Sequence, residues 1–213
     1  MTLYLDMRFI DIHTHKAADN CISIVDNGES TSDNIYISAG IHPWEITPQW
    51  EEKFTTIKSI AERPNTVAIG ECGFDYINSS ASRDLQYRVF TEHLLLSEDI
   101  GKPLIIHLVK GQEDLLKASR EHKHKQAWII HGFRGKPAQA KQLLAAGFYL
   151  SLGAKFNIET ARSIPLDRLF IESDMDDTPI HKVYENIAKA IGTTIAELAN
   201  QIERNIKSCN ISI

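Results

Sequence analysis

Two histidines with one residue between them close an apolar run near the N-terminus. The stretch FIDIHTH spans Phe9 to His15, and it begins with the apolar, β-branched residues of a buried strand. Side chains alternate between the two faces of a strand, so His13 and His15 project to the same side. Two imidazoles that converge at a strand end can bind one metal ion, although the same pair also occurs as ordinary polar residues of a turn.

Four further residues with metal-binding chemistry follow other apolar runs. Glu71 ends AIGE, His107 ends LIIH, His131 ends IIH, and Asp174 ends FIESD. Each has an ordinary alternative, as a helix cap, a core histidine or a turn residue. Chance does not explain why all of them lie at the C-terminal ends of predicted strands. In a barrel of parallel strands such ends meet at one mouth, so these side chains would converge there.

The elements that must position these residues alternate between apolar runs and helical patterns. The predicted strands are Phe9–His13, Cys21–Val25, Ile35–Ala39, Val67–Glu71, Leu104–His107, Trp128–His131, Tyr149–Leu152 and Leu169–Glu172. The predicted helices are Trp50–Glu62, Ser82–Ile100, Gln112–Lys123, Pro137–Ala146, Ile158–Ser163, Ile180–Ile191 and Thr194–Arg204. Apolar strands separated by helices indicate a parallel sheet, and eight of them predict an α/β fold, a TIM-type (β/α)8 barrel.

The chain is compact for such a barrel. Its 213 residues, 43% of them hydrophobic, suffice for one sizeable core, so we expect a single domain over residues 1–213. Too little chain for a helix lies between His15 and Cys21, and again between Val25 and Ile35. We therefore expect the first two repeats to be abbreviated, with the barrel wall there covered by loops or by a partner subunit.

Composition and charge argue against several classes of protein. No apolar stretch is long enough to cross a bilayer and no targeting segment is evident, so we expect a cytoplasmic protein without a membrane partner. The cysteines, Cys21, Cys72 and Cys209, are odd in number and lack a CxxC spacing, which predicts buried or half-buried thiols instead of disulfides or a thiolate zinc site. The net charge of −5 gives no global attraction to nucleic acid, so phosphate binding would depend on local cations or metal ions.

Four imidazoles and two carboxylates without a thiolate suit zinc, manganese, iron, nickel or cobalt. These donors exceed what one catalytic ion needs, so we predict two ions. The predicted assignment is His13, His15 and Asp174 for one ion, His107 and His131 for the other, and Glu71 as the bridge. Two neighbouring ions favour hydrolysis, because they lower the pKa of a water molecule and neutralise charge that develops in the transition state. Asp174 is the candidate general base.

Seven segments of the chain resemble the motifs of the TatD-family metal-dependent hydrolases, deoxyribonucleases of the amidohydrolase-like barrel superfamily. In order they are FIDIHTH, GIHPWE, AIGECGFDY, LIIH, IIHGFRG, PLDRLFIESD and Asn205. The resemblance implies two divalent ions (Zn, Mn, Mg, Ni or Co) and metal-dependent hydrolysis of phosphodiester bonds in DNA, often from a 3′ end. It also implies that His42 reaches toward a substrate phosphate and that Asp75 supports the site from behind, where a turn histidine and a loop cap are the ordinary alternatives.

The chain departs from the family pattern around the substrate. Val109 stands where the family usually has an arginine, and Lys110 follows it, so a phosphate contact is lost or moved. Arg134 in HGFRG replaces a small polar residue and offers a guanidinium group to phosphate, unless it is a solvated loop arginine. After the motif ESD the chain runs MDDTPIHKVY, whose aspartates would repel a phosphate backbone at the mouth.

The remaining conspicuous residues have simpler interpretations. Glu172 lies two residues before Asp174 and is expected to support the site from the same face. We expect exposed positions on helices or their ends for His93, His122, His124 and His181. Trp50 and Trp128 are expected to pack in the core, whereas Trp44 follows the GIHP turn and remains a possible surface for base stacking.

Three functions remain open from the sequence. The preferred one is an enzyme that hydrolyses phosphodiester bonds, with DNA or a small phosphodiester as substrate. The alternative is a metal hydrolase of the same superfamily that acts on a small phosphate ester, amide or lactone, which the short segment after Asp174 favours. A noncatalytic scaffold has no need of six metal-binding residues. The native metal, the exo or endo preference and the oligomeric state are left open.

Overall fold

Strands and helices alternate along the chain of this computed structural model, which describes residues 7–18, 21–27 and 36–213. The strands are β1 (Ile10–Thr14), β2 (Ile22–Asp26), β3 (Tyr36–Ala39), β4 (Thr66–Asp75), β5 (Leu104–Val109), β6 (Trp128–Ile130), β7 (Tyr149–Leu152) and β8 (Leu169–Ile171). The α-helices are α1 (Trp50–Ala61), α2 (Arg83–Ile100), α3 (Gln112–Glu121), α4 (Pro137–Ala145), α5 (Ile158–Ser163), α6 (Ile180–Ile191) and α7 (Ile195–Ser208), with short 3-10 helices η1 (Pro43–Glu45) and η2 (Leu166–Arg168).

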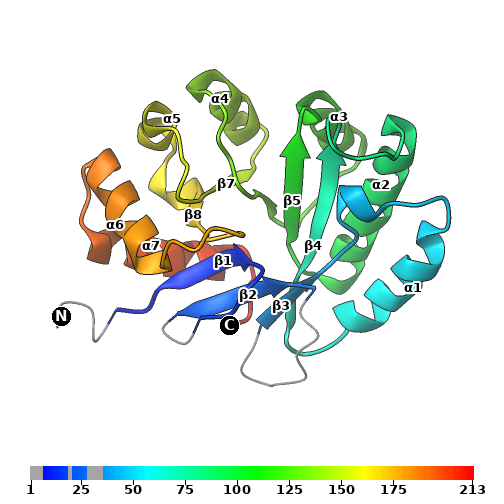
Figure 1. The fold of residues 1–213 in the computed structure, drawn as a ribbon, viewed down its shortest axis with the longest axis horizontal. Coiled ribbons are helices and arrows are strands. Elements are labelled where there is room, and N and C mark those ends of the chain that lie inside the picture. The colour runs from blue at the N-terminus through cyan, green and yellow to red at the C-terminus, as the bar shows by residue number, and fades with distance from the viewer. Residues whose placement is uncertain (1–6, 19–20, 28–35) are drawn as a thin grey trace.

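The strands form one parallel sheet in chain order from β1 to β8, with the helices outside it (Figure 1). A short bridge between Thr14 and Asp174 joins the two edges of this sheet. The Asp174 N–H donates to the His13 carbonyl at 3.0 Å, and the His15 N–H donates to the Asp174 carbonyl at 3.2 Å. The predicted (β/α)8 barrel is therefore confirmed, and its closing contact involves three of the predicted site residues.

The predicted strands are all present, but β4 differs from its prediction. It continues to Asp75, so Glu71 lies within the strand and not at its C-terminal end as predicted. The register of β4 against β5 shifts between Ile69 and Cys72, around a cis peptide bond between Gly70 and Glu71. The first predicted residue of the third strand, Ile35, lies outside the described residues.

The first two repeats are abbreviated, as the sequence predicts. No helix follows β1 or β2 within the described residues, and residues 19–20 and 28–35 lie outside them. A helix from the end of the chain instead reaches β1, because the Tyr184 hydroxyl of α6 donates to the Ile10 carbonyl at 2.8 Å and accepts from the Ile10 N–H at 3.3 Å. Cover by a partner subunit stays a prediction.

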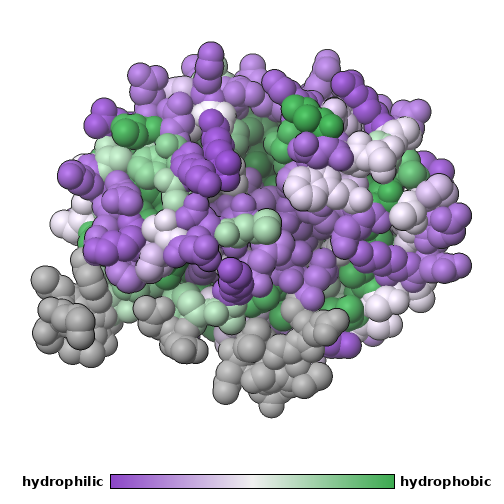
Figure 2. Space-filling model, in the orientation of Figure 1, coloured by the Kyte–Doolittle hydropathy of each residue, from purple (hydrophilic) through white to green (hydrophobic). Residues whose placement is uncertain are grey.

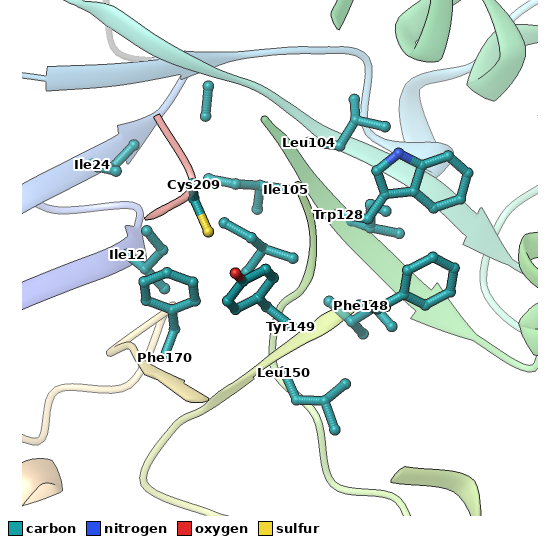
Figure 3. Packing of buried hydrophobic residues seen from close by; sticks show 14 of the residues in the cluster. Ile12, Ile24, Leu104, Ile105, Trp128, Phe148, Tyr149, Leu150, Phe170 and Cys209 are labelled. Carbon is teal, nitrogen blue, oxygen red and sulfur yellow. The ribbon is translucent and has the colours of Figure 1, made fainter. Parts of the chain in front are cut away.

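The core contains the apolar side chains that the strand pattern predicts (Figure 3). Phe148 stacks on Trp128 with 5.1 Å between ring centroids, and Trp50 is buried against Phe54, so both predicted packing tryptophans are confirmed. The three cysteines are free thiols, buried or half-buried as expected. In the described parts of the chain, no helix combines the length and the apolar character that crossing a membrane requires.

The prediction that His93 is exposed is wrong. Its imidazole is fully buried between α2 and the loop after β3. Nε2 accepts a hydrogen bond from the Ile41 N–H at 2.9 Å, so the proton lies on Nδ1, which donates to the Val89 carbonyl at 2.7 Å. His122, His124 and His181 are half-buried instead of exposed, and His124 stacks on Trp128.

The buried imidazole of His93 should make stability depend on pH. Burial lowers its pKa to about 4, below the ordinary value of about 6.5 that applies in the unfolded chain. The contribution of His93 to the free energy of unfolding is therefore complete above about pH 6.5 and is lost as the pH falls toward 4. The loss occurs because His93 of the unfolded chain takes up a proton at a higher pH than His93 of the folded chain. We expect His93 to contribute about 3 kcal/mol to this loss, measured by urea unfolding at several pH values.

The variants His93→Gln and His122→Gln test the assignment to this residue. The first should flatten the dependence of the unfolding free energy on pH over this interval. The second, at the C-terminal end of α3, serves as the matched control and should keep the wild-type slope. Equal slopes in the wild type and His93→Gln would contradict the assignment.

Candidate metal centre at the barrel mouth

The predicted metal-binding side chains meet in one cluster, although they come from five different segments of the chain. They are His13 and His15 at the end of β1, Glu71 in β4, His107 in β5, His131 after β6 and Asp174 after β8. Their ligand atoms form several overlapping groups of three within 4.8 Å of one another. One of these groups is the predicted set of His13, His15 and Asp174.

Glu71 is the centre of this cluster, and its two oxygens face different imidazoles. Oε1 lies 2.6 Å from His107 Nδ1 and 2.7 Å from His131 Nε2. Oε2 lies 3.2 Å from His13 Nε2 and 4.0 Å from His15 Nε2. The carboxylate therefore lies between two sets of imidazoles, with one set facing each oxygen.

Two glycines in AIGECGFDY allow β4 to hold Glu71 in this place. Gly70 and Gly73 have φ values of 138° and 137°, which side chains on L-residues rarely adopt. A Cβ at Gly70 would lie 2.3 Å from the Ile105 carbonyl oxygen, and one at Gly73 would lie 2.2 Å from that of His107. The close approach of β4 to β5 around Glu71 therefore depends on both glycines.

Asp174 joins His13 and His15 through the contact that closes the barrel. Its Oδ1 lies 3.5 Å from His15 Nε2 and 3.9 Å from His13 Nε2. The neighbouring Ser173 is held by Asp11, whose Oδ1 accepts from the Ser173 N–H at 2.9 Å and whose Oδ2 accepts from the Ser173 hydroxyl at 2.6 Å. Burial raises the pKa of Asp11 to about 7.

His42 lies among the potential metal ligands, with its imidazole in direct contact with Glu71 and His107. Its Nε2 is 3.2 Å from Glu71 Oε1 and 3.2 Å from His107 Nδ1. Its Nδ1 accepts from the Trp44 N–H at 3.2 Å, which leaves Nε2 directed at the cluster. The predicted role toward substrate stays a prediction, and the geometry also makes His42 a potential ligand.

Two acidic residues, Asp75 and Glu172, lie on the far side of the histidines from Glu71. Asp75 Oδ2 is 3.3 Å from His107 Nε2 and accepts from the Trp44 indole N–H at 2.6 Å. Glu172 Oε1 is 3.5 Å from His131 Nδ1 and accepts from the Gly132 N–H at 2.7 Å. A carboxylate behind a histidine fixes its tautomer and directs its other nitrogen forward, here toward Glu71.

Sequence reasoning missed Asp11 and Asp26. Asp26 Oδ1 accepts from the Glu71 N–H at 2.8 Å and is grouped with His15 and Glu71 in the cluster. Its position at the end of the apolar run ISIVD was the available signal, since the other site residues were found in the same way. Asp11 precedes His13 by two residues, but its partner Ser173 is far away in the sequence.

Charges within the cluster stabilise one another. Burial alone would raise the pKa of Glu71, but the nearby His131 and hydrogen bonds from histidines hold it well below its usual range. Burial would lower the pKa of His131, but the negative charge of Glu71 raises it. The hydrogen bond that His15 donates to Asp174 raises the pKa of His15, and the same contact holds the pKa of Asp174 down against the effect of burial.

The donors present fit divalent metal ions. Imidazole nitrogens and carboxylate oxygens are typical ligands of zinc, manganese and similar ions. His13 is fully buried, yet neither of its ring nitrogens makes a well-aligned hydrogen bond within the described part of the chain. Buried polar atoms nearly always have a partner, and a metal ion at Nε2 would provide one.

Two cavities open beside the cluster. The larger, of about 900 Å³, lies between β5 with α3 and β6 with α4, and the smaller, of about 560 Å³, lies between the loops after β6, β7 and β8. Asp174 and Arg134 line both, and Lys110 lines the larger. Neither Lys110 nor Arg134 makes an ion pair or side-chain hydrogen bond with any described residue.

The aspartates after Asp174 are already paired with lysines. Asp176 Oδ2 lies 3.4 Å from Lys155 Nζ, and Asp177 Oδ1 lies 3.2 Å from Lys16 Nζ. Both aspartates line the smaller cavity, so they do face the mouth. The lysines offset the repulsion of phosphate that the sequence predicts, although such exposed pairs are screened by solvent.

Comparisons with known proteins agree with this geometry. The model of a family described as TatD related DNase matches residues 8–210. An "Uncharacterized metal-dependent hydrolase" of Buchnera aphidicola is 34% identical over 149 residues, which cover 66% of this chain and 56% of that relative. The "Uncharacterized metal-dependent hydrolase YabD" of Bacillus subtilis is 31% identical over 196 residues, which cover 82% of this chain and 77% of the relative.

A third relative has a more specific name, and a solved structure shares the fold. The "3'-5' ssDNA/RNA exonuclease TatD" of Erwinia tasmaniensis is 28% identical over 152 residues, which cover 67% of this chain and 58% of the relative. The crystal structure of a hydrolase TatD family protein from Entamoeba histolytica superimposes with a TM-score of 0.78 at 15% identity, over 96% of this chain and 98% of that one.

Replacing the central carboxylate should weaken metal binding without unfolding the chain. We expect Glu71→Gln to bind Mn²⁺ or Zn²⁺ at least about tenfold more weakly than the wild type, because even outer partners of ligands are worth that much. Calorimetry and metal analysis after gel filtration provide the measurement. Glu52→Gln, an exposed change on α1, is the matched control, and wild-type affinity in Glu71→Gln would contradict the bridging assignment.

Proposed function

Because the chain belongs to the TatD related DNase family, we propose that it is a metal-dependent hydrolase that cleaves phosphodiester bonds in DNA from a 3′ end. The observation that carries this proposal is the position of Glu71 between two sets of imidazoles at the barrel mouth. Lys110 and Arg134 beside it, which have no ion-pair partner among the described residues, suit a substrate that carries phosphate.

We propose that two divalent ions bind here, held by the residues that the sequence analysis assigned. His13, His15 and Asp174 would hold one ion, His107 and His131 the other, and Glu71 would bridge them, with His42 as a further ligand or phosphate contact. Bound ions would supply positive charge for a phosphate oxygen and lower the pKa of a water molecule.

The residues of the chain position the reactants and move one proton. Asp174 lines both cavities and its pKa is held low, so its carboxylate is ionised and can accept a proton from the attacking water. The water oxygen forms a bond to phosphorus while the bond from phosphorus to the 3′ oxygen breaks. Asp174 can then return the proton to the departing 3′ oxygen, which balances the reaction.

Asp75 and Glu172 contribute by holding His107 and His131 in a fixed orientation. Both carboxylates are buried, and each contacts the ring nitrogen that faces away from Glu71. The cost of ordering the two imidazoles is therefore met during folding, and not when a substrate binds.

DNA is the favoured substrate because one relative is named a 3'-5' ssDNA/RNA exonuclease. The alternative is a small phosphate ester, amide or lactone. It is favoured by the acidic segment after Asp174, because Asp176 and Asp177 line the smaller cavity and, paired with Lys155 and Lys16, add no net positive charge for a second phosphate group. Cleavage of a simple diester without cleavage of DNA would fit the small-molecule alternative, whereas cleavage of both would fit a DNA hydrolase.

Removing and restoring metal tests the proposed reaction. Protein stripped with a chelator should cleave neither single-stranded DNA nor bis(p-nitrophenyl) phosphate, and Mg²⁺, Mn²⁺ or Zn²⁺ should restore both activities. Asp174→Ala should lower the rate by ~100-fold or more, the usual contribution of a positioned general base. Glu71→Ala should lower it by at least about tenfold through the loss of bound metal. Asp99→Ala, an exposed change on α2, is the control.

The outcomes separate the candidate functions. Retained activity in both site variants would contradict the mechanism. Cleavage of the small diester without cleavage of DNA would favour the small-molecule alternative. No cleavage of either substrate by the metal-loaded protein would overturn the proposed phosphodiesterase activity.

The two cations beside the cluster should contribute to substrate affinity. We expect Lys110→Ala and Arg134→Ala each to raise KM for single-stranded DNA about tenfold with a smaller change in kcat, because a charge-assisted hydrogen bond is worth about 1.5–3 kcal/mol. Lys141→Ala, on the exposed side of α4, is the matched control. An unchanged KM in both variants would place the phosphate contacts elsewhere.

A further inference from the structure

The larger cavity has features that the hydrolysis of a phosphodiester does not require. We call it the α3–α4 cavity, and it is lined chiefly by Leu116, Ile130, Phe133, Gln112 and Gln142 in addition to the site residues. Its volume of about 900 Å³ is within the range of pockets that bind small molecules, and it opens directly onto His107, His131 and Asp174. A group bound there would be attached to the phosphate under attack.

One part of the cavity wall is apolar. Ile130 and Phe133 are buried, and Leu116 on α3 is half-buried. Hydrophobic residues also show at the upper edge of the molecule between the positions of α4 and α3 (Figure 2). Such a wall does not stabilise a purely ionic substrate. It does stabilise a flat aromatic group, because the apolar faces of that group are removed from water there.

A pair of amides links the two helices that form the cavity. Gln112 Nε2 on α3 donates to Gln142 Oε1 on α4 at 2.6 Å. The second oxygen and nitrogen of the pair, Gln112 Oε1 and Gln142 Nε2, make no hydrogen bond to another described residue. They therefore offer an acceptor beside a donor, which is the pattern that glutamine and asparagine use to bind the edge of a nucleobase.

The charged residues of the cavity are consistent with a nucleotide. Lys110 and Arg134 provide two cations on its lining, next to the metal-binding cluster. Trp44 lies at the edge nearest His107 and is 55% exposed, and its indole N–H is fixed on Asp75. Cations for phosphate, an apolar wall and an amide edge thus occur in one cavity.

We propose that the α3–α4 cavity binds the nucleobase of the nucleotide whose phosphate lies at the candidate metal centre. The apolar wall of Leu116, Ile130 and Phe133 contacts the face of the base, and the amide pair of Gln112 and Gln142 binds its edge. This inference rests on the proposed function, since it assigns a place to one part of a nucleic acid substrate.

Binding of a mononucleotide tests the proposal without turnover. The probes are deoxyadenosine 5′-monophosphate and 2-deoxyribose 5-phosphate, which differ only in the base, titrated by calorimetry or ligand-observed NMR in EDTA. We expect the nucleotide to bind at least about tenfold more tightly than the sugar phosphate. Equal affinities would overturn the proposal, whatever the protein hydrolyses.

Two variants locate the difference within the cavity. Leu116→Trp should fill the space beside the apolar wall and abolish the preference for the nucleotide, whereas Leu95→Trp, on the exposed side of α2, should retain it. Gln142→Leu alters an exposed residue outside the buried core, and it should reduce the preference several-fold while leaving sugar phosphate affinity unchanged. A full preference for the nucleotide in both Leu116→Trp and Gln142→Leu would overturn the assignment to this cavity.

These results are separable from a failure of the proposed function. Base-dependent binding that is lost in the cavity variants would support the α3–α4 cavity as a nucleotide site even if metal-loaded protein cleaved no diester. Conversely, hydrolysis of DNA with equal binding of the two probes would support the proposed function and contradict the base site.

Discussion

The burial of a carboxylate among imidazoles is the constraint on which the rest of this structure depends. Glu71 is 2% exposed, and a charge so far from water is tolerated only when partners surround it. Those partners come from the ends of β1, β5 and β6 and from the loop after β3, so these segments must converge. A barrel of parallel strands places them at one mouth, and Gly70 and Gly73 let β4 approach β5 closely enough to carry Glu71 to its centre.

A second set of carboxylates holds this centre in place. Asp75 and Glu172 contact the outward nitrogens of His107 and His131, while Asp11 holds Ser173 beside Asp174 and Asp26 accepts from the Glu71 backbone. Each of them contacts a residue whose orientation matters, and each comes from a strand or its end. Contacts with residues on rigid strands thus fix the conformations of side chains that would otherwise rotate. The site is therefore preorganised before any ligand binds.

The sequence predicted most of the fold because strand and helix periods leave a clear pattern in a buried parallel sheet. The same pattern picked out the residues that the structure brings together in the cluster, since residue types change from apolar to ligating at or near the end of each predicted strand, although β4 continues past Glu71. It failed where three-dimensional contacts decide. His93 lies on an amphipathic helix, and the sequence does not show whether a histidine there faces the core or the solvent. Its partner, the Ile41 N–H, is a backbone group that no pattern of side chains reveals. The extension of β4 past Glu71 depends on glycines that also occur in turns, and the contact between Asp11 and Ser173 joins residues far apart in the chain.

The closure of the barrel at Thr14 and Asp174 has a consequence for when the site can exist. These residues are 160 positions apart, so almost the whole chain must be in place before they meet. His13 and His15 lie beside Asp174 only once that contact has formed. A nascent or partly unfolded chain therefore carries the same residues without the assembled cluster, and any chemistry that needs the whole cluster would be confined to molecules that have finished folding.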